Sequence, residues 1–260
     1  MDLHLRSHFQ HDIESILCSL KNPMSLFNSY TNQALILIGL VTYVFPAIGW
    51  AQQNLFNVPS SEITEKNKLF FQQQFNVSSV SGTGNTTLDY GLGHDLEIGI
   101  NLFNLDLYPS NGYLQNPHLL FNFQKGLKVT ESYKMSFGTQ TGLTPPLYHA
   151  TIQVPSFSYL NNAVDLNKWG KYYLGAYYAN HAYAGPGDSL GIMAGVEFPL
   201  LKNMNLMGDI LTGNNSISVA VVGMVFYLPD YWQLSFGAQL PAPTSNNDYG
   251  AVIEITKLKW

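Results

Sequence analysis

Charged residues and cysteine are scarce in this chain. Only 11% of its 260 residues are charged, against about 25% in ordinary soluble domains. Lys and Arg together number 12, Asp and Glu 17, and Arg6 is the only arginine. The sequence therefore predicts no nucleic-acid binding, because contacts with phosphates rest on clustered Lys and Arg. The single cysteine, Cys18, excludes a disulfide framework and a cysteine-type zinc site.

Long apolar runs are missing outside the N-terminal region. The run at 34–45, ALILIGLVTYVF, carries no charge and is followed by Pro46. It is shorter than the ~20 residues of a membrane-spanning helix, so an anchor is the weaker alternative. Its length is typical of a secretory signal, and Gly49 and Ala51 are the small residues of a cleavage site. We therefore expect residues 1–51 to be a leader and signal peptide that is removed after Ala51.

The residues before this run leave the start of translation open between Met1 and Met24. His4, His8 and His11 have a spacing that places three imidazoles on one helical face. If the leader is removed, these histidines never reach the mature protein.

Apolar residues beyond the leader recur with a period of two, not with the period of a helix. Leu96, Ile98, Ile100 and Leu102 alternate with more polar neighbours, and the same pattern recurs at 190–198 and 232–240. A period of two places successive side chains on opposite faces of a strand. The sequence therefore predicts an all-β chain with little helix.

Turn residues divide the chain after residue 65 into a series of such runs. We expect strands at 66–79, 85–92, 95–107, 116–126, 130–142, 147–158, 170–182, 188–200, 203–213, 216–228, 231–241 and 249–260. The connections alternate between short and long, which is typical of bacterial outer-membrane barrels with short periplasmic turns and longer outer loops. The connection at 161–169 is too long for this scheme and has no explanation from the sequence.

Two features favour a membrane barrel over a soluble β-sandwich or a lipocalin-like barrel. The apolar faces of the three clearest runs contain no Lys, Arg, Asp or Glu. Aromatic residues gather at strand ends, where interfacial girdles lie: Tyr172, Phe198, Tyr227, Tyr231, Trp232 and Trp260. We predict an antiparallel transmembrane β-barrel of about 12 strands over residues 66–260. A periplasmic N-terminal segment at 52–65 and the cleavable signal peptide precede it.

A family resemblance enters at residues 87–99, which read TLDYGLGHDLEIG. The "YGL" strand end, the tight turn and the "LEIG" strand resemble outer-membrane barrels associated with the meta-pathway of phenol degradation. The resemblance implies import of small organic compounds and brings no catalytic residues.

The C-terminus resembles the aromatic-terminated last strand that the barrel assembly machinery recognises, since the chain ends in Trp260 with Leu258 two residues before it. Ile253 and Ile255 lie in the opposite phase from these two residues. A bulge, or a tail that leaves the sheet, must therefore intervene.

Polar side chains face the lumen if the apolar faces point to lipid. The candidate residues for solute contact are Glu97, Asn101, Lys134, Gln153, Tyr173, Tyr177, His181, Glu197 and Asp209. Tyr173, Tyr177 and His181 share a face of one expected strand, from which they would stack against an aromatic solute. The three acids, with Lys134 as the main basic residue, predict a preference for cations or neutral solutes.

We therefore predict an outer-membrane transporter or channel for small, weakly polar or aromatic solutes. The alternative is a non-conducting structural or binding barrel, because ~12 strands lie between filled 8-stranded and open 16-stranded barrels. The expected partners are outer-membrane lipids, the barrel assembly machinery and a small hydrophobic or aromatic solute.

Enzymatic chemistry has little support in the sequence. His149 and Thr151 share a face of an expected strand, a spacing that sets an imidazole beside a hydroxyl nucleophile. A Thr replaces the usual Ser, and lipid hydrolysis is therefore a minor alternative. No P-loop, dinucleotide-binding or zinc-protease motif occurs, so we predict no enzyme and no cofactor.

Calcium binding in the loops is another minor alternative. Asp188, Asp248, Asn246 and Asn247 supply the oxygen ligands that Ca²⁺ prefers. Oxygen-rich loops are more often solvated than bound to metal, so the sequence predicts no metal site.

Overall fold

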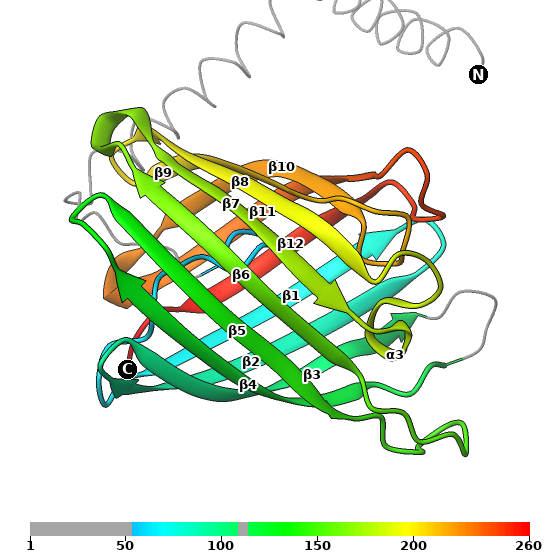
Figure 1. Cartoon of the computed structure of the whole chain (residues 1–260). Coiled ribbons are helices and arrows are strands. Elements are labelled where there is room, and N and C mark those ends of the chain that lie inside the picture. Colours follow the sequence, from blue (N-terminus) through cyan, green and yellow to red (C-terminus); the bar gives the residue numbers. More distant parts are fainter. Residues whose placement is uncertain (1–53, 109–113) are drawn as a thin grey trace, which may run out of the picture. The chain divides into compact units, whose positions relative to one another are not determined.

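Twelve antiparallel strands form a closed barrel in the computed structural model, which describes residues 54–108 and 114–260 (Figure 1). The first six strands are β1 (Leu69–Ser78), β2 (Gly82–Gly93), β3 (Leu96–Tyr108), β4 (His118–Lys128), β5 (Tyr133–Leu143) and β6 (Ser156–Asp165). The other six are β7 (Lys171–Ala179), β8 (Leu190–Leu201), β9 (Met204–Leu211), β10 (Val219–Tyr227), β11 (Trp232–Pro241) and β12 (Gly250–Lys257). Helical structure in the described part is limited to α3 (His181–Ala184), η2 (Asn167–Trp169) and η3 (Pro229–Tyr231).

Each strand pairs with its neighbours in the sequence, and β1 pairs with β12 to close the ring. Phe71 lies opposite Lys257 and Ser78 opposite Gly250 in this closing ladder. Closure leaves no edge strand with free backbone groups. The predicted antiparallel barrel is confirmed. Among the described residues, no helix is long and apolar enough to cross a bilayer.

The outer and inner faces of the wall differ as the alternation predicts. Ile98, Ile192 and Phe236 point outward and are 44%, 55% and 43% exposed. Their neighbours in each strand point inward, among them Glu97 and Ser235, which are buried. The apolar faces of the three clearest runs therefore line the outside of the barrel.

The two ends of the barrel carry connections of different length. Short turns lie at the end where β1 begins and β12 finishes, which we call the turn end: 94–95, 129–132, 166–170, 202–203 and 228–231. The connections at the opposite end, the loop end, are mostly longer, and include 144–155, 180–189, 212–218 and 242–249. This alternation of short turns and long loops also follows the sequence.

The sixth strand lies further along the chain than the sequence predicts. Residues 144–155 form a loop with one bridge between Thr144 and Gln153. β6 covers residues 161–165 of the connection that was unexplained, and the turn with η2 forms the rest of it. Pro145 and Pro155 lack the N–H group that a ladder requires. The apolar residues between these prolines alternate as in a strand, which led to the wrong prediction. Asn161 is typical of a turn but lies within β6.

Aromatic residues surround the turn end. The rings of Tyr172 and Phe198 meet edge to face with centroids 5.6 Å apart. Lys257 Nζ lies 5.1 Å from the ring centroid of Trp232. Tyr227 does not belong to this girdle, because it points into the lumen and its hydroxyl donates to Glu197.

The C-terminal tail leaves the sheet after Lys257. Leu258 N donates to Tyr231 O at 2.9 Å, Lys259 Nζ lies 4.3 Å from the ring of Tyr231, and Trp260 is exposed. This tail explains the change of phase between Ile255 and Leu258.

Candidate functional site: the barrel lumen and its N-terminal segment

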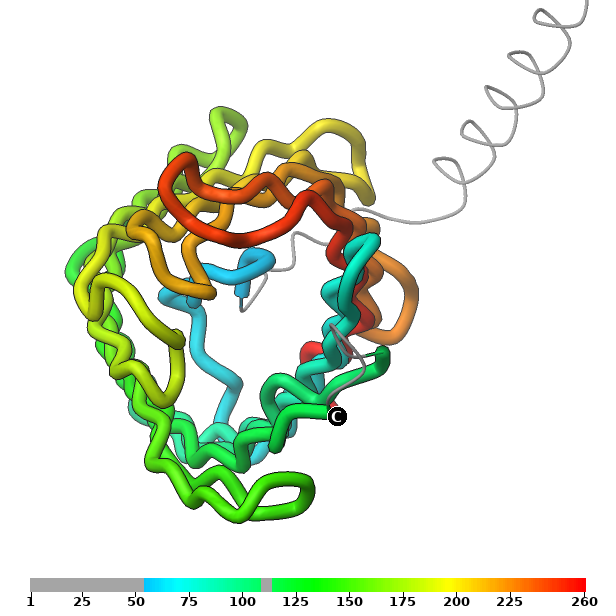
Figure 2. Tube along the Cα trace, turned by 90° about the vertical axis from the view of Figure 1, so that its right-hand side faces the viewer, coloured from blue at the N-terminus to red at the C-terminus, as the bar shows by residue number. Residues whose placement is uncertain are grey.

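Residues 54–65, which we call the lumen segment, lie inside the barrel before β1 begins. Figure 2 looks into the ring of strands and shows this blue part of the chain within it. The sequence predicts a periplasmic segment at 52–65, and the described residues 54–65 lie in the lumen instead. The segment lacks any periodic apolar pattern, so its sequence resembles that of a linker. The expected cleavage site after Ala51 and the histidines of the leader lie outside the described residues.

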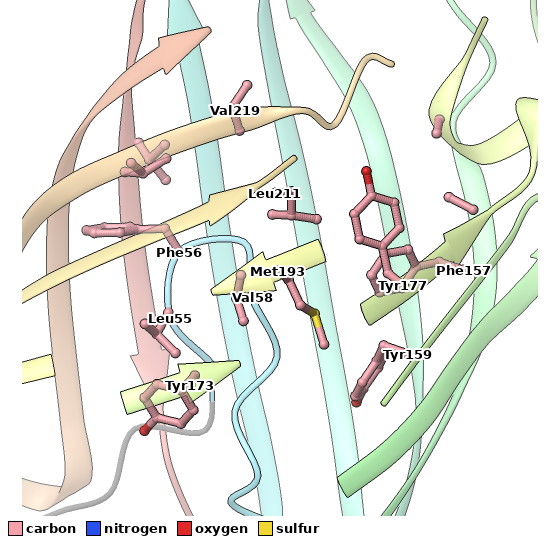
Figure 3. Packing of buried hydrophobic residues seen from close by; sticks show 14 of the residues in the cluster. Leu55, Phe56, Val58, Phe157, Tyr159, Tyr173, Tyr177, Met193, Leu211 and Val219 are labelled. Carbon is pink, nitrogen blue, oxygen red and sulfur yellow. The ribbon is translucent and has the colours of Figure 1, made fainter. Parts of the chain in front are cut away.

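The tip of the lumen segment is a short apolar turn. Leu55 N donates to Val58 O at 3.0 Å, and Asn54 bridges to Pro59. Leu55, Phe56 and Val58 are almost fully buried and belong to one apolar cluster with inward side chains of the wall (Figure 3). Burial of these side chains favours the docked tip, because apolar area is removed from water.

Two of the predicted lumen acids bind backbone N–H groups of this segment. Asp209 Oδ2 accepts from Asn57 N at 2.5 Å and from Val58 N at 2.9 Å. Glu97 Oε2 accepts from Thr64 N at 2.7 Å. Hydrogen bonds of this kind to carboxylates are stronger than those between neutral groups. These acids therefore hold the segment, and Glu97 also lines the cavity described below.

Wall amides satisfy carbonyl groups of the segment. Gln74 donates to Phe56 O at 2.7 Å, Gln124 to Ser60 O at 2.8 Å and Asn161 to Pro59 O at 2.5 Å. Ser61 and Ser136 also approach, with 3.1 Å between their hydroxyl oxygens. Buried backbone groups of the segment are thus paired with side chains of the wall.

Lys134 points into the lumen as predicted and forms an ion pair with the lumen segment. Its Nζ lies 2.6 Å from Glu62 Oε2, and Lys171 Nζ lies 3.5 Å from Glu62 Oε1. The sequence offered no partner for Lys134 outside the wall acids.

The other inward candidates take part in the packing of the wall. Glu197 accepts from Asn205 Nδ2 at 2.6 Å and from the hydroxyl of Tyr227. Tyr173 and Tyr177 are buried in the apolar cluster. Their inward direction agrees with the sequence prediction, but packing and not open pore surrounds them.

Asn101 belongs to a hydrogen-bonded group of polar side chains on β2, β3 and β4. Its Oδ1 accepts from Asn122 Nδ2 at 2.8 Å, and Asn122 also donates to Asp89 at 3.0 Å. These three residues line the cavity described below.

Two candidate lumen residues do not lie on strands. His181 begins α3 and is exposed, because Asn180 ends the strand by capping the helix through Tyr183 N. Gln153 lies exposed in the loop between β5 and β6. The prediction that each lies on a strand was wrong, because β7 ends at Ala179 and β6 begins only at Ser156; their contact with a solute stays a prediction.

The strand that would align His149 with Thr151 is also absent. Both residues are exposed in the 144–155 loop, where His149 Nε2 lies 2.9 Å from Leu114 O. Asp188 and Asp248 lie on different loops, and the described residues contain no group of three or more His, Cys, Asp or Glu side chains placed to hold a metal.

A polar cavity of about 380 Å³ lies between the tip of the lumen segment and the loop end. Asn54, Phe56, Asn57 and Pro59 of the segment form part of its lining. Amide side chains dominate the rest, including Asn76, Asn85, Asn101, Asn122, Gln140 and Gln239. Among the described residues, its charged lining consists of the acids Asp89, Glu97 and Asp248, and no Lys, Arg or His lines it.

Three stacked rings border this cavity. Tyr183, from α3, lies between Phe103 and Phe157, with centroids 4.8 and 5.2 Å apart and ring planes within 15° and 21°. The Tyr183 hydroxyl donates to Gln140 Oε1 at 3.2 Å, and burial raises the pKa of this hydroxyl above its usual value. No sequence spacing brings together three residues so far apart, and the sequence analysis therefore missed this stack.

Comparisons with solved structures find the same architecture in porins. The structure described as "NanC porin structure in rhombohedral crystal form" superposes with a TM-score of 0.52 and 8% identity, covering 72% of this chain and 97% of that one. The fold is that of a twelve-stranded porin barrel. The structure described as "KdgM porin in complex with disordered oligogalacturonate" gives a TM-score of 0.51 and 6% identity, covering 72% of this chain and 98% of that one. No family model and no curated protein matches the sequence.

Proposed function

We propose that this protein is an outer-membrane channel that admits small solutes into its lumen from the loop end. The observation that carries the proposal is the polar cavity inside a closed barrel whose outer face is apolar. Such a wall suits lipid outside and a hydrated solute inside. Short turns face the periplasm in barrels of this kind, so the loop end would face the exterior.

The lining of the cavity favours uncharged or cationic solutes. The charged side chains found in it are acidic, and amide groups supply both donors and acceptors. Asp89 and Asp248 would repel an anion, and no basic residue in the described lining compensates them. The solute class would therefore differ from an oligogalacturonate, the acidic sugar chain in the KdgM complex.

The stacked rings support the narrower proposal of a weakly polar or aromatic solute. A flat molecule gains by stacking on rings such as Phe103 and Phe157, and Gln140 accepts a hydrogen bond beside them. The tyrosine between the two phenylalanines has this chemistry itself, since it combines a flat ring with one hydroxyl. The resemblance to barrels of phenol degradation points the same way but stays a prediction.

A non-conducting binding barrel is the second candidate, and the lumen segment is the observation that favours it. Its contacts with the wall run from Gln74 on β1 to Asp209 on β9. Under either proposal the exposed tail that ends in Trp260 would be read by the assembly machinery, and lipids would surround the wall.

Localisation and conduction are tested with purified protein. We expect the protein in outer-membrane fractions, and a shift in its gel mobility on boiling, because closed barrels resist detergent. In a planar bilayer the refolded protein should give discrete current steps. A correctly folded barrel that gives no steps under any voltage would support the binding barrel and contradict the channel.

A further inference from the structure

The barrel wall is fitted to the lumen segment by glycines. Four inward-facing glycines, on β2, β4, β8 and β11, lie where the segment approaches most closely. A Cβ atom at Gly91 would lie 2.2 Å from Glu65 O, one at Gly126 2.9 Å from Ile63 Cγ1, one at Gly195 2.5 Å from Leu55 Cδ2 and one at Gly237 2.8 Å from Phe56 Cζ. At Gly91 the approaching atom is backbone, so a larger residue there would displace the segment; at Gly126 and Gly195 a side chain of the segment would have to shift, and at Gly237 the wall residue Val221 lies closer still, at 2.4 Å. The docked position is therefore part of the fold.

Backbone hydrogen bonds found between the segment and the wall lie at the base of the segment. Asn67 N donates to Gly91 O at 2.8 Å, and Gly91 N donates to Lys68 O at 3.0 Å. Beyond this base, the contacts found between residues 54–65 and the wall involve side chains, not shared backbone ladders. The wall itself closes through the ladder of β1 with β12. The tip is thus able to leave the lumen without breaking a strand pair of the barrel.

The segment lies on the way from the cavity to the turn end. Its tip borders the cavity through Phe56 and Asn57. Its following part binds wall residues close to the short turns, including Glu62 with Lys134 and with Lys171. The cavity lining reaches Glu97, close to the 94–95 turn, so a solute that moved through the cavity toward the turn end would pass beside the segment.

We propose that residues 54–65 are a gate, and that solute passes to the turn end only when the 54–59 tip leaves its docked position. This inference rests on the proposed channel function and adds a regulated element to it. The docked tip provides the closed state, in which the cavity is a binding site without an exit. Displacement about the base at Asn67 and Lys68 provides the open state.

A disulfide between the segment and the wall tests the gate directly. The hydroxyl oxygens of Ser61 and Ser136 are 3.1 Å apart and both residues are buried, so Ser61→Cys with Ser136→Cys places two thiols side by side, where oxidation can join them. Cys18→Ser removes the only native thiol from the full chain. We expect solute uptake by protein in liposomes to be lost when this pair is oxidised and restored when it is reduced.

A crosslink within the wall is the matched control. Val222 and Ala238 lie opposite each other on β10 and β11, and both are exposed on the outer face of the wall. Val222→Cys with Ala238→Cys therefore joins two wall strands without touching the lumen segment or the cavity. Oxidation of this pair should leave uptake unchanged.

A variant with a weakened tip, which we call the release variant, tests the opposite change to the disulfide. Leu55→Ala with Phe56→Ala removes apolar anchors of the tip and alters no residue of the wall. We expect faster uptake than in the unmodified protein. When Ser61→Cys is added to this variant as a single reporter thiol, it should react faster with an impermeant maleimide, which reports exposure of the segment independently of transport.

The outcomes separate the gate from the channel. Uptake that is equal in the oxidised and reduced forms of the Ser61→Cys, Ser136→Cys protein would overturn the gate and leave the channel standing. No uptake by any form, including a release variant whose reporter thiol becomes reactive, would overturn the channel and the gate with it. Loss of uptake on oxidation of only the gate pair supports both.

Discussion

Lys134 Nζ lies 2.6 Å from Glu62 Oε2, so the main basic residue of the lumen is paired with the N-terminal segment and not with a wall acid. Glu97 and Asp209 bind the same segment through its backbone N–H groups. Residues that the sequence predicts to select solutes thus hold the segment in place. Asp209 is not part of the cavity lining, so the selectivity of the cavity comes from Glu97, Asp89, Asp248 and the amides that line it.

Neutralising Glu62 should loosen the lumen segment. In Glu62→Gln the ion pairs with Lys134 and Lys171 are lost. Because Glu62 and Lys134 are partly exposed, we expect a loss of about 1 kcal/mol or less in the free energy of unfolding, together with faster uptake. Thermal gel-shift curves and liposome uptake measure the two effects.

The turn pair of Lys128 and Glu131 is the control for this change. Its Nζ to Oε1 distance is 2.8 Å, and it lies outside the lumen. Lys128 also lowers the pKa of the Glu131 carboxyl. Glu131→Gln should leave uptake unchanged. A similar increase in uptake from both variants would contradict a specific role for Glu62.

An arginine on the lipid face should cost more stability than one facing the cavity on the same strand. Leu88 points outward near the middle of β2, and its neighbour Thr87 lines the cavity. We expect Leu88→Arg to lower the free energy of unfolding by about 2–4 kcal/mol if it lies near the bilayer midplane, and Thr87→Arg to cost much less. Unfolding in lipid vesicles measures both, and equal costs would mean that the wall does not face lipid.

Ile192 and Met193 on β8 also face opposite sides of the wall, but they are less suitable for this comparison of two arginine variants. Ile192 is exposed on the outer face, as predicted. Met193 faces inward but is fully buried in the apolar cluster. An arginine there would be buried without a partner and would also destabilise the barrel.

Selectivity for cations should depend on the acids that line the cavity. Replacing Asp89 and Asp248 with Asn removes negative charge without changing the size of the side chains greatly. We expect the reversal potential under a salt gradient to shift toward anions, since acidic residues in a pore wall favour cations. Asp95→Asn, in the short turn after β2, is the control, and an unchanged potential in the double variant would remove these acids from the conduction path.

The aromatic stack should determine any preference for flat solutes. Tyr183→Leu removes the central ring between Phe103 and Phe157 and its hydrogen bond to Gln140. We expect the uptake ratio of an aromatic alcohol to an aliphatic alcohol of similar size to change. Tyr178→Leu alters a tyrosine on the outer face and should leave the ratio as it is. If the two variants behave alike, the stack does not contact the solute.

The wall was predictable from the sequence because alternation and turn residues are local signals. Alternate residues of β3, such as Ile98 and Ile100, and Ile192 on β8 face outward as expected. The inward direction of Glu97, Lys134 and Glu197 follows from the same period of two. The prediction of the sixth strand was wrong because the residues between Pro145 and Pro155 alternate like a strand, whereas the prolines lack the N–H groups that a strand ladder requires.

The occupied lumen was not predictable in this way, because it depends on contacts between residues far apart in the chain. Val58 and Asp209 are separated by 151 positions, and Pro59 and Asn161 by 102. The signal that was present is the set of inward-facing glycines, such as Gly195 and Gly237. Glycine is unfavourable in a strand unless another group approaches closely; Leu55 approaches Gly195, and Val221 and Phe56 approach Gly237.

The swelling of liposomes that contain the purified protein tests the central claim most directly. Uncharged solutes and anionic solutes of matched size are compared at the same osmotic strength. We predict swelling with the uncharged solutes, and much slower swelling with the anions, because the charged side chains of the cavity are acidic. No swelling with any solute, or faster swelling with the anions, would contradict the account.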